Sequence, residues 1–513
     1  MINRILNTIF FWLLMAGILS SAHAARRELR VAIYPYIPDL LDDKLQSLSS
    51  WIKRSFESQN PEINLTVVSP PVDIYDVNAV TKYLNGPNAP HIIEMDTILL
   101  GDLVNNDLIA ETNAQDYDLD TQGAYLQFPL QAVQLNGTYY GVPTFICGTF
   151  LIGANVTLEM CPLHDGVGNL SSLNDTLDQC ERDLITPPRT VTVLGNVKGS
   201  FTLPLLYMDA YIDFHGCNSV YEAIDSDIFS ETDVISAIKS FLQYCDERNS
   251  IQNKCLDGSI KDNRVFTKEI VGGSSITAYS YSEMIGNFLQ YAINSDKIFD
   301  AYSVIAPPLG PQNNFLMYTD ALMVNKRLPL SAENQQDINT FINFYTDLST
   351  RLSIAFGEDL PEPHPPRYLL QARQDFYSSV QVTSDPVYTQ LTEVLEYAVA
   401  APNRLFYNER DRMNKDLIEV LDAPKDLAAV ATVSFAIRCE LLSIQHGRHQ
   451  EMDLDDFDST LKNTSQRYWE TLPDAISDLI CLSHANNAQS TCEGINLFLL
   501  LLMTFVILCL NGF

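Results

Sequence analysis

One cysteine stands in a segment whose residue types suit a chemical role. Cys147 lies within Tyr140-Gly-Val-Pro-Thr-Phe-Ile-Cys147-Gly-Thr-Phe-Leu-Ile152, after a Gly-Val-Pro turn and before a short β-prone run. A thiolate in such a place can act as a nucleophile. The local sequence leaves two other roles open: an inert core residue, since free cysteine is often buried, or half of a disulfide.

An acidic residue ends the strand predicted over 90–96. Ligands of open α/β sheets gather at the carboxyl ends of strands, so Asp96 is placed to meet one. Capping of the following segment, Thr97 to Leu103, is the alternative role of this side chain.

Two further acids stand beside tyrosines. Glu283 follows Tyr279-Ser-Tyr281-Ser at a predicted strand-to-helix junction, and interaction with the helix N-terminus is its alternative role. Asp320 follows Tyr318 inside the apolar strand predicted over 315–325.

The elements that must position these residues begin with a β-α-β pattern. A strand from Glu28 runs into a Pro-rich loop with Tyr34 and Tyr36, and apolar residues at helical spacing over 45–56 precede a strand over 63–68. This order predicts parallel strands with a right-handed crossover. Further along, we expect a turn at Asn136-Gly137, helices over 233–244 and 282–292, a stiff Pro-rich linker over 357–366, and helices then a polar stalk beyond about 411.

Both ends of the chain have the composition of targeting signals. Residues 1–24 have Arg4, an apolar run and Ala22-His-Ala24, as in a secretory signal peptide. Near the C-terminus, small residues around Asn486, a polar spacer and an apolar run over 495–510 are typical of a GPI attachment signal, with Asn486 as anchor residue and 487–513 removed. A single transmembrane helix is the alternative, although no Lys or Arg follows it. The expected location is the extracellular face of the plasma membrane.

Composition agrees with export and excludes one class of partner. The six Asn-X-Ser/Thr sequons predict glycosylation at Asn64, Asn136, Asn155, Asn169, Asn174 and Asn463. The formal charge of −32 argues against nucleic-acid binding, which needs basic patches.

Cysteine pairing is expected but not determined by spacing. Ten cysteines are present, of which Cys509 and Cys492 would leave with the C-terminal segment. Among the other eight, Cys161 with Cys180 and Cys245 with Cys255 would close short loops, while other connectivities stay open.

Several segments, in order, resemble the thiaminase I family over roughly residues 29 to 410. They are Ala32-Ile-Tyr34-Pro-Tyr36-Ile-Pro38, Asp96 after its strand, Gly141-Val-Pro-X-X-X-Cys147, Tyr281-Ser-Glu283-Met284, Tyr318-Thr-Asp320, Pro366-X-Tyr368-Leu-Leu-X-Ala372-Arg373 and Pro402-Asn-Arg404. The segment over 153–200, the region after 410 and the C-terminal signal have no counterpart in the compact bacterial members.

The resemblance implies an α/β fold of the two-lobed type II periplasmic-binding-protein kind, with the ligand in the interlobe cleft. Lobe 1 would comprise 25–140 and 301–350, and lobe 2 would comprise 141–300, with an insertion at 153–200, and 351–425. A helical appendage and stalk would cover 426–486.

The resemblance also implies roles for the residues above. Cys147 corresponds to a nucleophile that adds to the pyrimidine of thiamine, and Glu283 to its activating base. Asp96 and Asp320 correspond to acids that hydrogen-bond the aminopyrimidine. The aromatic lining would be Tyr34, Tyr36, Tyr281 and Tyr318. The thiazole would leave, and a base or thiol co-substrate would accept the pyrimidinylmethyl group, without cofactor or metal.

Two other functions stay open. A noncatalytic cell-surface receptor for thiamine or a related pyrimidine could use the same scaffold, because a fold does not fix a function. A cysteine hydrolase of another kind is the third possibility, although no Cys/His signature is present. No Gly-rich phosphate loop supports a nucleotide site.

Overall fold

The computed structural model describes residues 26–154, 168–184, 191–199, 202–216, 219, 231–246, 253–260, 263–297, 299, 301–403 and 407–422. The predicted signal peptide, stalk and C-terminal signal lie outside these ranges, as do Asn155, Asn463 and Asn486. Clustering of contacts gives two units, Met1–Ser226 with Thr232–Leu417, and Asp227–Glu231 with Ile418–Phe513. Within the described ranges, no helix has the length and apolar character needed to cross a membrane.

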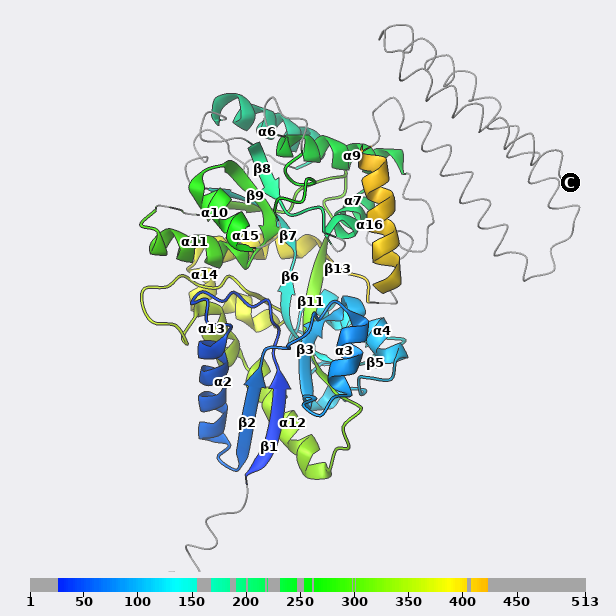
Figure 1. Ribbon diagram of the computed structural model, residues 1–513, viewed down its shortest axis with the longest axis vertical. Helices are drawn as coiled ribbons and strands as arrows, with labels where there is room; N and C mark the ends of the chain where they lie inside the picture. Colours follow the sequence, from blue (N-terminus) through cyan, green and yellow to red (C-terminus); the bar gives the residue numbers. More distant parts are fainter. Residues whose placement is uncertain are drawn as a thin grey trace, which may run out of the picture. The chain divides into compact units, whose positions relative to one another are not determined.

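A seven-stranded sheet forms the lower part of the first unit in Figure 1. Its order is β12-β6-β11-β3-β1-β2, with β13 beside β11. The strands are β1 (Arg27–Ala32), β2 (Ile63–Val68), β3 (Ile92–Asp96), β6 (Val142–Cys147), β11 (Phe315–Val324), β12 (Leu370–Gln371) and β13 (Ala398–Ala400). Because β1 is parallel to both β2 and β3, the carboxyl ends of these three strands share one edge.

The predicted β-α-β unit is confirmed. Helix α2 (Gln46–Gln59) joins β1 to the parallel strand β2 and buries Leu48, Ile52 and Phe56, spaced four residues apart. This spacing puts one apolar stripe on the face turned toward the sheet. Helix α3 (Val77–Leu84) then leads to β3, and Asp76 caps it by accepting from the amides of Asn78 and Ala79.

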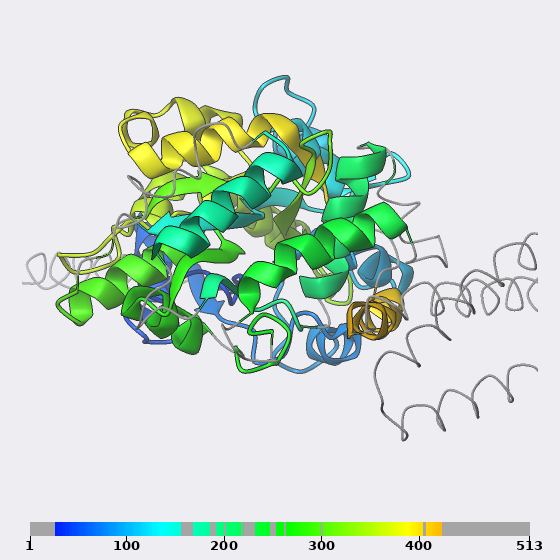
Figure 2. The same ribbon diagram turned by 90° about the horizontal axis from the view of Figure 1, so that it is seen from above.

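A second, four-stranded sheet has the order β10-β7-β9-β8. Its strands are β7 (Thr149–Ala154), β8 (Val191–Gly195), β9 (Ser275–Tyr281) and β10 (Ala301–Ile305). Helices α6 (Leu170–Leu184), α7 (Thr202–His215), α9 (Thr232–Leu242), α10 (Asn263–Gly272), α11 (Met284–Asn294) and α15 (Pro386–Val394) surround it. Figure 2 shows α6 and α9 side by side in teal and green, where Asn174 Nδ2 donates to Ser240 Oγ at 2.9 Å.

Gly148 alone separates β6 from β7, so the chain passes from one sheet to the other at this residue. A Cβ atom here would lie 2.4 Å from Met317 Sδ and 3.1 Å from Phe315 Cε2. Only glycine therefore allows β11 to approach the junction this closely.

Two local predictions are confirmed. A hairpin joins β4 (Gln134–Leu135) to β5 (Thr138–Tyr139), and its turn residues Asn136 and Gly137 have φ of 52° and 82°. Positive φ at both positions is the signature of a type I′ turn, which Asn-Gly favours. Helix α16 (Tyr407–Asp422) lies where a helix was expected near residue 411.

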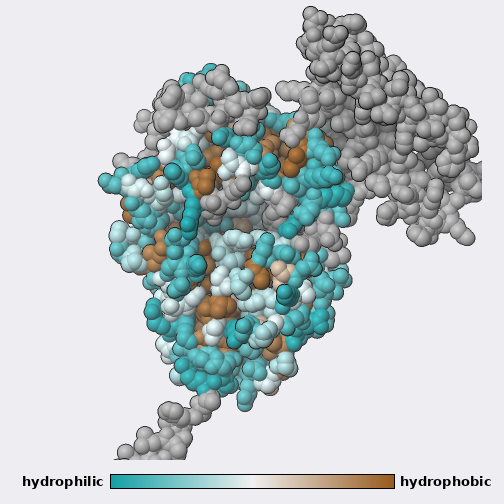
Figure 3. Space-filling view, viewed as in Figure 1, coloured by the Kyte–Doolittle hydropathy of each residue, from teal (hydrophilic) through white to brown (hydrophobic). Residues whose placement is uncertain are grey.

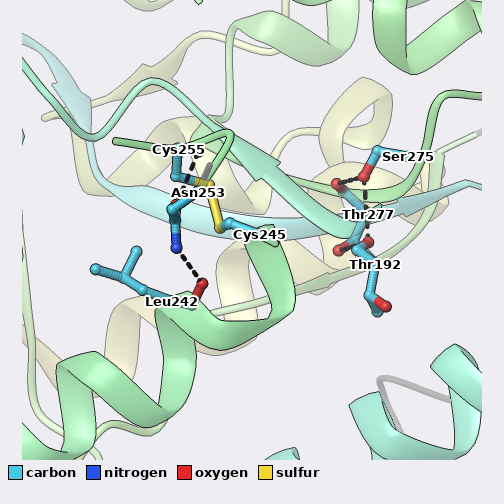
Figure 4. The surroundings of a disulfide bond; sticks show 7 residues. All are labelled: Thr192, Leu242, Cys245, Asn253, Cys255, Ser275 and Thr277. Carbon is cyan, nitrogen blue, oxygen red and sulfur yellow. Dashed lines mark hydrogen bonds between the residues drawn. A yellow bond between two sulfur atoms is a disulfide. The ribbon is translucent and has the colours of Figure 1, made fainter. Parts of the chain in front are cut away.

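The disulfide between Cys245 and Cys255 is present, with an S–S distance of 2.11 Å. Figure 4 shows Asn253 beside it, where Asn253 Oδ1 accepts from the Cys255 amide and Nδ2 donates to Leu242 O. Cys180 is also disulfide-bonded. Its predicted partner, Cys161, lies outside the described residues.

The face of the molecule in Figure 3 is mostly hydrophilic where it is coloured, and apolar residues gather there in separate groups. Among the described residues, the large apolar side chains that are exposed come from distant parts of the sequence: Tyr36, Leu41, Val265, Ile293, Val380 and Tyr397.

Candidate active site

Cys147 is the last residue of β6 and lies directly opposite Tyr318 of β11. It is half-buried, and it is the free cysteine of the described residues. Burial, and then the negative charge of Glu283, raise the pKa of the Cys147 thiol well above its ordinary value. The resting side chain is therefore a thiol, and a base must remove its proton before it can act as a nucleophile.

Glu283 is placed beside this thiol by the second sheet. It stands two residues after the end of β9, immediately before α11, and Tyr281 of β9 pairs with Thr149 of β7. Thr149 follows Cys147 by two residues, so the strand register brings the two functional groups together. The Glu283 side chain makes no capping hydrogen bond to α11.

The Glu283 carboxyl has the properties of a base that works near neutral pH. Burial raises its pKa to about 7. Ser282 Oγ donates to Glu283 Oε2 at 3.4 Å. A carboxyl with a pKa near the working pH can accept a proton and return it with similar ease.

Asp96 and Asp320 lie opposite each other in neighbouring antiparallel strands, β3 and β11. Both side chains are about 3% exposed. Burial raises the pKa of Asp96 to about 7. Burial, and then the charge of Asp96, raise the pKa of Asp320 well above its ordinary range. Two carboxyl groups held this way retain a proton near neutral pH, so one can donate while the other accepts.

The capping role considered for Asp96 is present in the structure, and it leaves one carboxyl oxygen for other contacts. Its Oδ1 accepts from the Ile98 amide at 3.0 Å and so caps the 3-10 turn Thr97–Leu99. Its Oδ2 accepts from Tyr75 Oη at 3.3 Å. The cap fixes the carboxyl and leaves its other oxygen turned toward the tyrosines.

Tyrosines surround the acids. Tyr34 Oη and Tyr75 Oη are 3.0 Å apart, and the ring of Tyr36 stacks on that of Tyr75 with centroids 5.8 Å apart. Tyr281 and Tyr318 meet edge to face at 6.5 Å. Tyr36 is 48% exposed whereas Tyr34 is buried. Flat aromatic faces of this kind suit heteroaromatic rings and cations.

Tyr75 was not among the residues expected at the site. It lies in the loop that follows β2, as Tyr34 follows β1 and Asp96 ends β3. The rule that pointed to Asp96, that ligands gather at the carboxyl ends of strands, would have pointed to this loop as well.

Among the described residues, no group of three or more His, Cys, Asp or Glu side chains is arranged to hold a metal ion. The groups that lie near one another are the Cys147 thiol, the Glu283 carboxyl, the buried pair Asp96 and Asp320, and tyrosines. This set suits nucleophilic chemistry at the thiol, with carboxyl groups nearby for proton transfer.

Comparison with known proteins gives the relatives of the chain. No family model matches the chain. The chain is 25% identical to Thiaminase-1 of Paenibacillus thiaminolyticus over 391 residues, which is 76% of this chain and 86% of the relative. The chain is a homologue of thiaminase I.

Solved structures of other proteins show which fold this chain has. Thiaminase I of Clostridium botulinum in complex with thiamin has a TM-score of 0.56 at 18% identity, over 77% of this chain and all of that one. A maltose-bound binding protein of T. maritima has a TM-score of 0.60 at 15% identity, over 81% and 99%. The fold is that of the type II periplasmic binding proteins, as the resemblance implied.

Two of the segments that resemble thiaminase I make contacts that stabilise the fold. Arg367 forms a two-pronged ion pair with Asp359 at 2.7 Å, and both side chains are 1% exposed. Asn403 Nδ2 donates to the carbonyl groups of Gln131, Ala132 and Gln134. Arg404, in the same segment, lies outside the described residues.

Proposed function

We propose that this chain degrades thiamine by transferring its pyrimidinylmethyl group to a base or thiol, with Cys147 as nucleophile and Glu283 as base. The observation that supports this best is the placement of Glu283 beside the thiol, with the Asp96–Asp320 pair on the neighbouring strands. The likeness to Thiaminase-1 over three quarters of the chain supports the substrate class.

The reaction starts with proton transfer from the Cys147 thiol to Glu283. The thiolate adds to the pyrimidine ring, and the C–N bond between the methylene carbon and the thiazole nitrogen then breaks, so that neutral thiazole departs with the bonding electrons. The incoming nucleophile attacks the methylene carbon, the C–S bond to Cys147 breaks, and Glu283 returns the proton. Because the pKa of Glu283 is about 7, both transfers are accessible at neutral pH.

The acid pair and the tyrosines hold the substrate in this proposal. An ionised carboxylate of the pair accepts from the amino group of the pyrimidine, while the protonated partner donates to a ring nitrogen. The tyrosine rings face the pyrimidine and the cationic thiazolium, whose charge the acidic surroundings also favour.

A noncatalytic thiamine receptor is the second candidate. The likeness in fold to a maltotriose binding protein favours it, since a scaffold of this fold can bind a ligand. The free thiol next to a carboxyl that titrates near neutrality favours the enzyme, because binding alone needs neither group.

The deciding experiment measures thiamine loss by the purified protein with and without pyridine as acceptor. We expect rapid loss in the wild type, and a fall of about 10³-fold or more in Cys147→Ser and Glu283→Gln, since a nucleophile and its base act as a unit. Glu333→Gln, an exposed glutamate in the first turn of α12 (Ala332–Thr346), is the matched control and should keep full activity.

Three outcomes separate the candidates. A pyridine adduct of the pyrimidine in the wild type alone supports the transferase. Saturable binding without loss makes the protein a receptor. Loss that persists in Cys147→Ser shows that another residue is the nucleophile.

We also propose that the protein acts outside the cell, attached by a GPI anchor. The support is the sequence of the two ends and the sequons, of which Asn136 lies exposed at the tip of a hairpin. Release of the protein from intact cells by a phosphatidylinositol-specific phospholipase is expected; retention after this treatment would favour a transmembrane helix.

A further inference from the structure

A buried arginine acts electrostatically on the acid pair. Arg351, in α13 (Leu348–Phe356), is 1% exposed. Its guanidinium carbon lies 3.7 Å from the ring centre of Phe145 and 4.9 Å from that of Tyr345. Arg351 Nε donates to Gln371 Oε1 at 2.6 Å. Phe145 and Gln371 are paired across β6 and β12, so the guanidinium rests against the strand that ends in Cys147.

The other two nitrogens of this guanidinium, Nη1 and Nη2, make no hydrogen bond of ordinary geometry within the described residues, and the guanidinium interacts with the Tyr345 hydroxyl, whose pKa it acts to lower. A buried charge left this way costs several kcal/mol unless nearby charges of opposite sign compensate. The negative groups close enough to respond to it belong to the site. Arg351 opposes the rise that burial causes in the pKa of Glu94 and of Asp320.

Glu94 links this charge to the tyrosines. It precedes Asp96 by two residues on β3, so both side chains lie on the same face of the sheet. Glu94 Oε2 accepts from the Tyr34 amide at 2.9 Å and from Tyr345 Oη at 3.0 Å. The Tyr34 hydroxyl is hydrogen-bonded to the Tyr75 hydroxyl, which donates to Asp96 Oδ2. Glu94 is therefore connected with the acid pair through Tyr34 and Tyr75.

We propose that Arg351 is the buried counter-charge of the acidic site, a positioning residue that favours an ionised carboxyl group in the Asp96–Asp320 pair. This inference deepens the proposed function and rests on it, because the ionised carboxyl is the one that would hold the aminopyrimidine. Arg351 acts through the pair and does not touch the reacting atoms.

The groups that bear on this equilibrium come from several elements. The seven-stranded sheet and its loops contribute Tyr34, Tyr75, Glu94 and Cys147. The second sheet contributes Tyr281 and Glu283. The helices contribute Tyr345 and Arg351. Arg351 is the cation of this set. Its loss should therefore raise the pH at which the pair ionises, and loss of Glu94 should lower it.

The test compares Arg351→Met, which keeps the apolar volume over Phe145, with Arg351→Lys, which keeps the charge. At a pH on the acidic side of the optimum, we expect Arg351→Met to raise KM for thiamine. The rise should be about tenfold for each pH unit by which the ionisation of the acid pair shifts, and kcat should change less. The acidic limb of the kcat/KM profile should move to higher pH in Arg351→Met, return toward wild type in Arg351→Lys, and move to lower pH in Glu94→Gln.

Arg373→Met is the matched control. Arg373 also lies over an aromatic ring, 5.7 Å from the centre of Tyr125, but pairs with Asp375 in a half-buried position. Its removal should leave the pH profile in place. Equal losses of activity in both Arg351 variants, without movement of either limb, would overturn the proposal.

A second measurement does not depend on turnover. Infrared difference spectra of the substrate-free protein follow protonation of carboxyl groups with pH. If the wild type proves inactive on thiamine but Arg351→Met and Glu94→Gln still move this titration in opposite directions, the proposed function fails and the role of Arg351 stands. If neither variant moves the titration, the role of Arg351 is wrong, whatever the activity.

Discussion

Asp320 and Asp359 are both buried aspartates, and the structure treats them in opposite ways. Asp359 receives two hydrogen bonds from Arg367, which also donates to the carbonyl groups of Ile354 and Pro38. Asp320 stands opposite Asp96 in the strand register, and within the described residues Arg351 is the cation that acts on it, without a direct ion pair.

The difference separates an acid that holds the fold from an acid that is available to a ligand. The Arg367 fork satisfies both carboxylate oxygens of Asp359, so this pair has little left to offer a substrate. The Asp96–Asp320 pair places two carboxyl groups together in a buried position, which is unfavourable when either is ionised. The arrangement persists because the pairing of the surrounding strands holds both residues there. Such strain is typical of a binding or catalytic site.

Removing Arg367 should cause the largest loss of stability. Arg367→Met leaves Asp359 buried without its partner, which costs about 3–5 kcal/mol of unfolding free energy. Thermal and urea unfolding measure this loss, and kcat/KM for thiamine at low temperature should stay within a few-fold of wild type. The double variant Asp359→Asn/Arg367→Met should recover part of the stability. A small effect in the single variant would contradict the structural role of the pair.

Asp320→Asn should show the reverse pattern. We expect kcat/KM to fall about hundredfold, since a hydrogen bond to a charged group is worth roughly 1.5–3 kcal/mol. Stability near neutral pH should stay equal or rise, because asparagine does not have to be kept protonated beside Asp96, as the raised pKa of Asp320 requires. Steady-state kinetics and thermal unfolding of the same preparation test both halves. A variant that is active and destabilised would place Asp320 in the same class as Asp359.

The pH dependence of stability should distinguish the two acids further, with a smaller effect. The pKa of Asp320 is raised in the folded protein, so between about pH 4 and the folded value the native state binds more protons than the unfolded state. Stability contributed by this group is therefore greatest at low pH and falls as pH rises. The stability gained by Asp320→Asn over wild type should be small near pH 4.5 and grow toward pH 8, as urea midpoints would show. A stability difference between Asp320→Asn and wild type that does not change with pH would mean that folding does not raise the pKa of Asp320.

Much of the fold was predictable because its signals are local. The apolar spacing in α2, the opening strands and the Asn-Gly turn follow from residue periodicity and turn preferences, and each was found where expected. The loop that contains Tyr75 has no such pattern. Glu94 and Arg351 were not predicted to act at the site either. They lie 257 positions apart in the sequence, and no local pattern shows that two such distant charged residues are close in the fold.

The sequence by itself determined which chemical groups are present: a cysteine after a Gly-Val-Pro turn, and acids at the ends of strands or inside them. It also indicated the family that these segments resemble. Only the tertiary structure decided which of them meet. Asp96 faces Asp320 because β3 and β11 pair in that register, and a shift by one residue would turn each side chain to the other face of the sheet. Glu283 lies near enough to Cys147 to act on its pKa because Gly148 lets the chain cross between the sheets where β11 is close. Long-range pairing and close approach of this kind depend on the whole packed unit, and no local segment contains them.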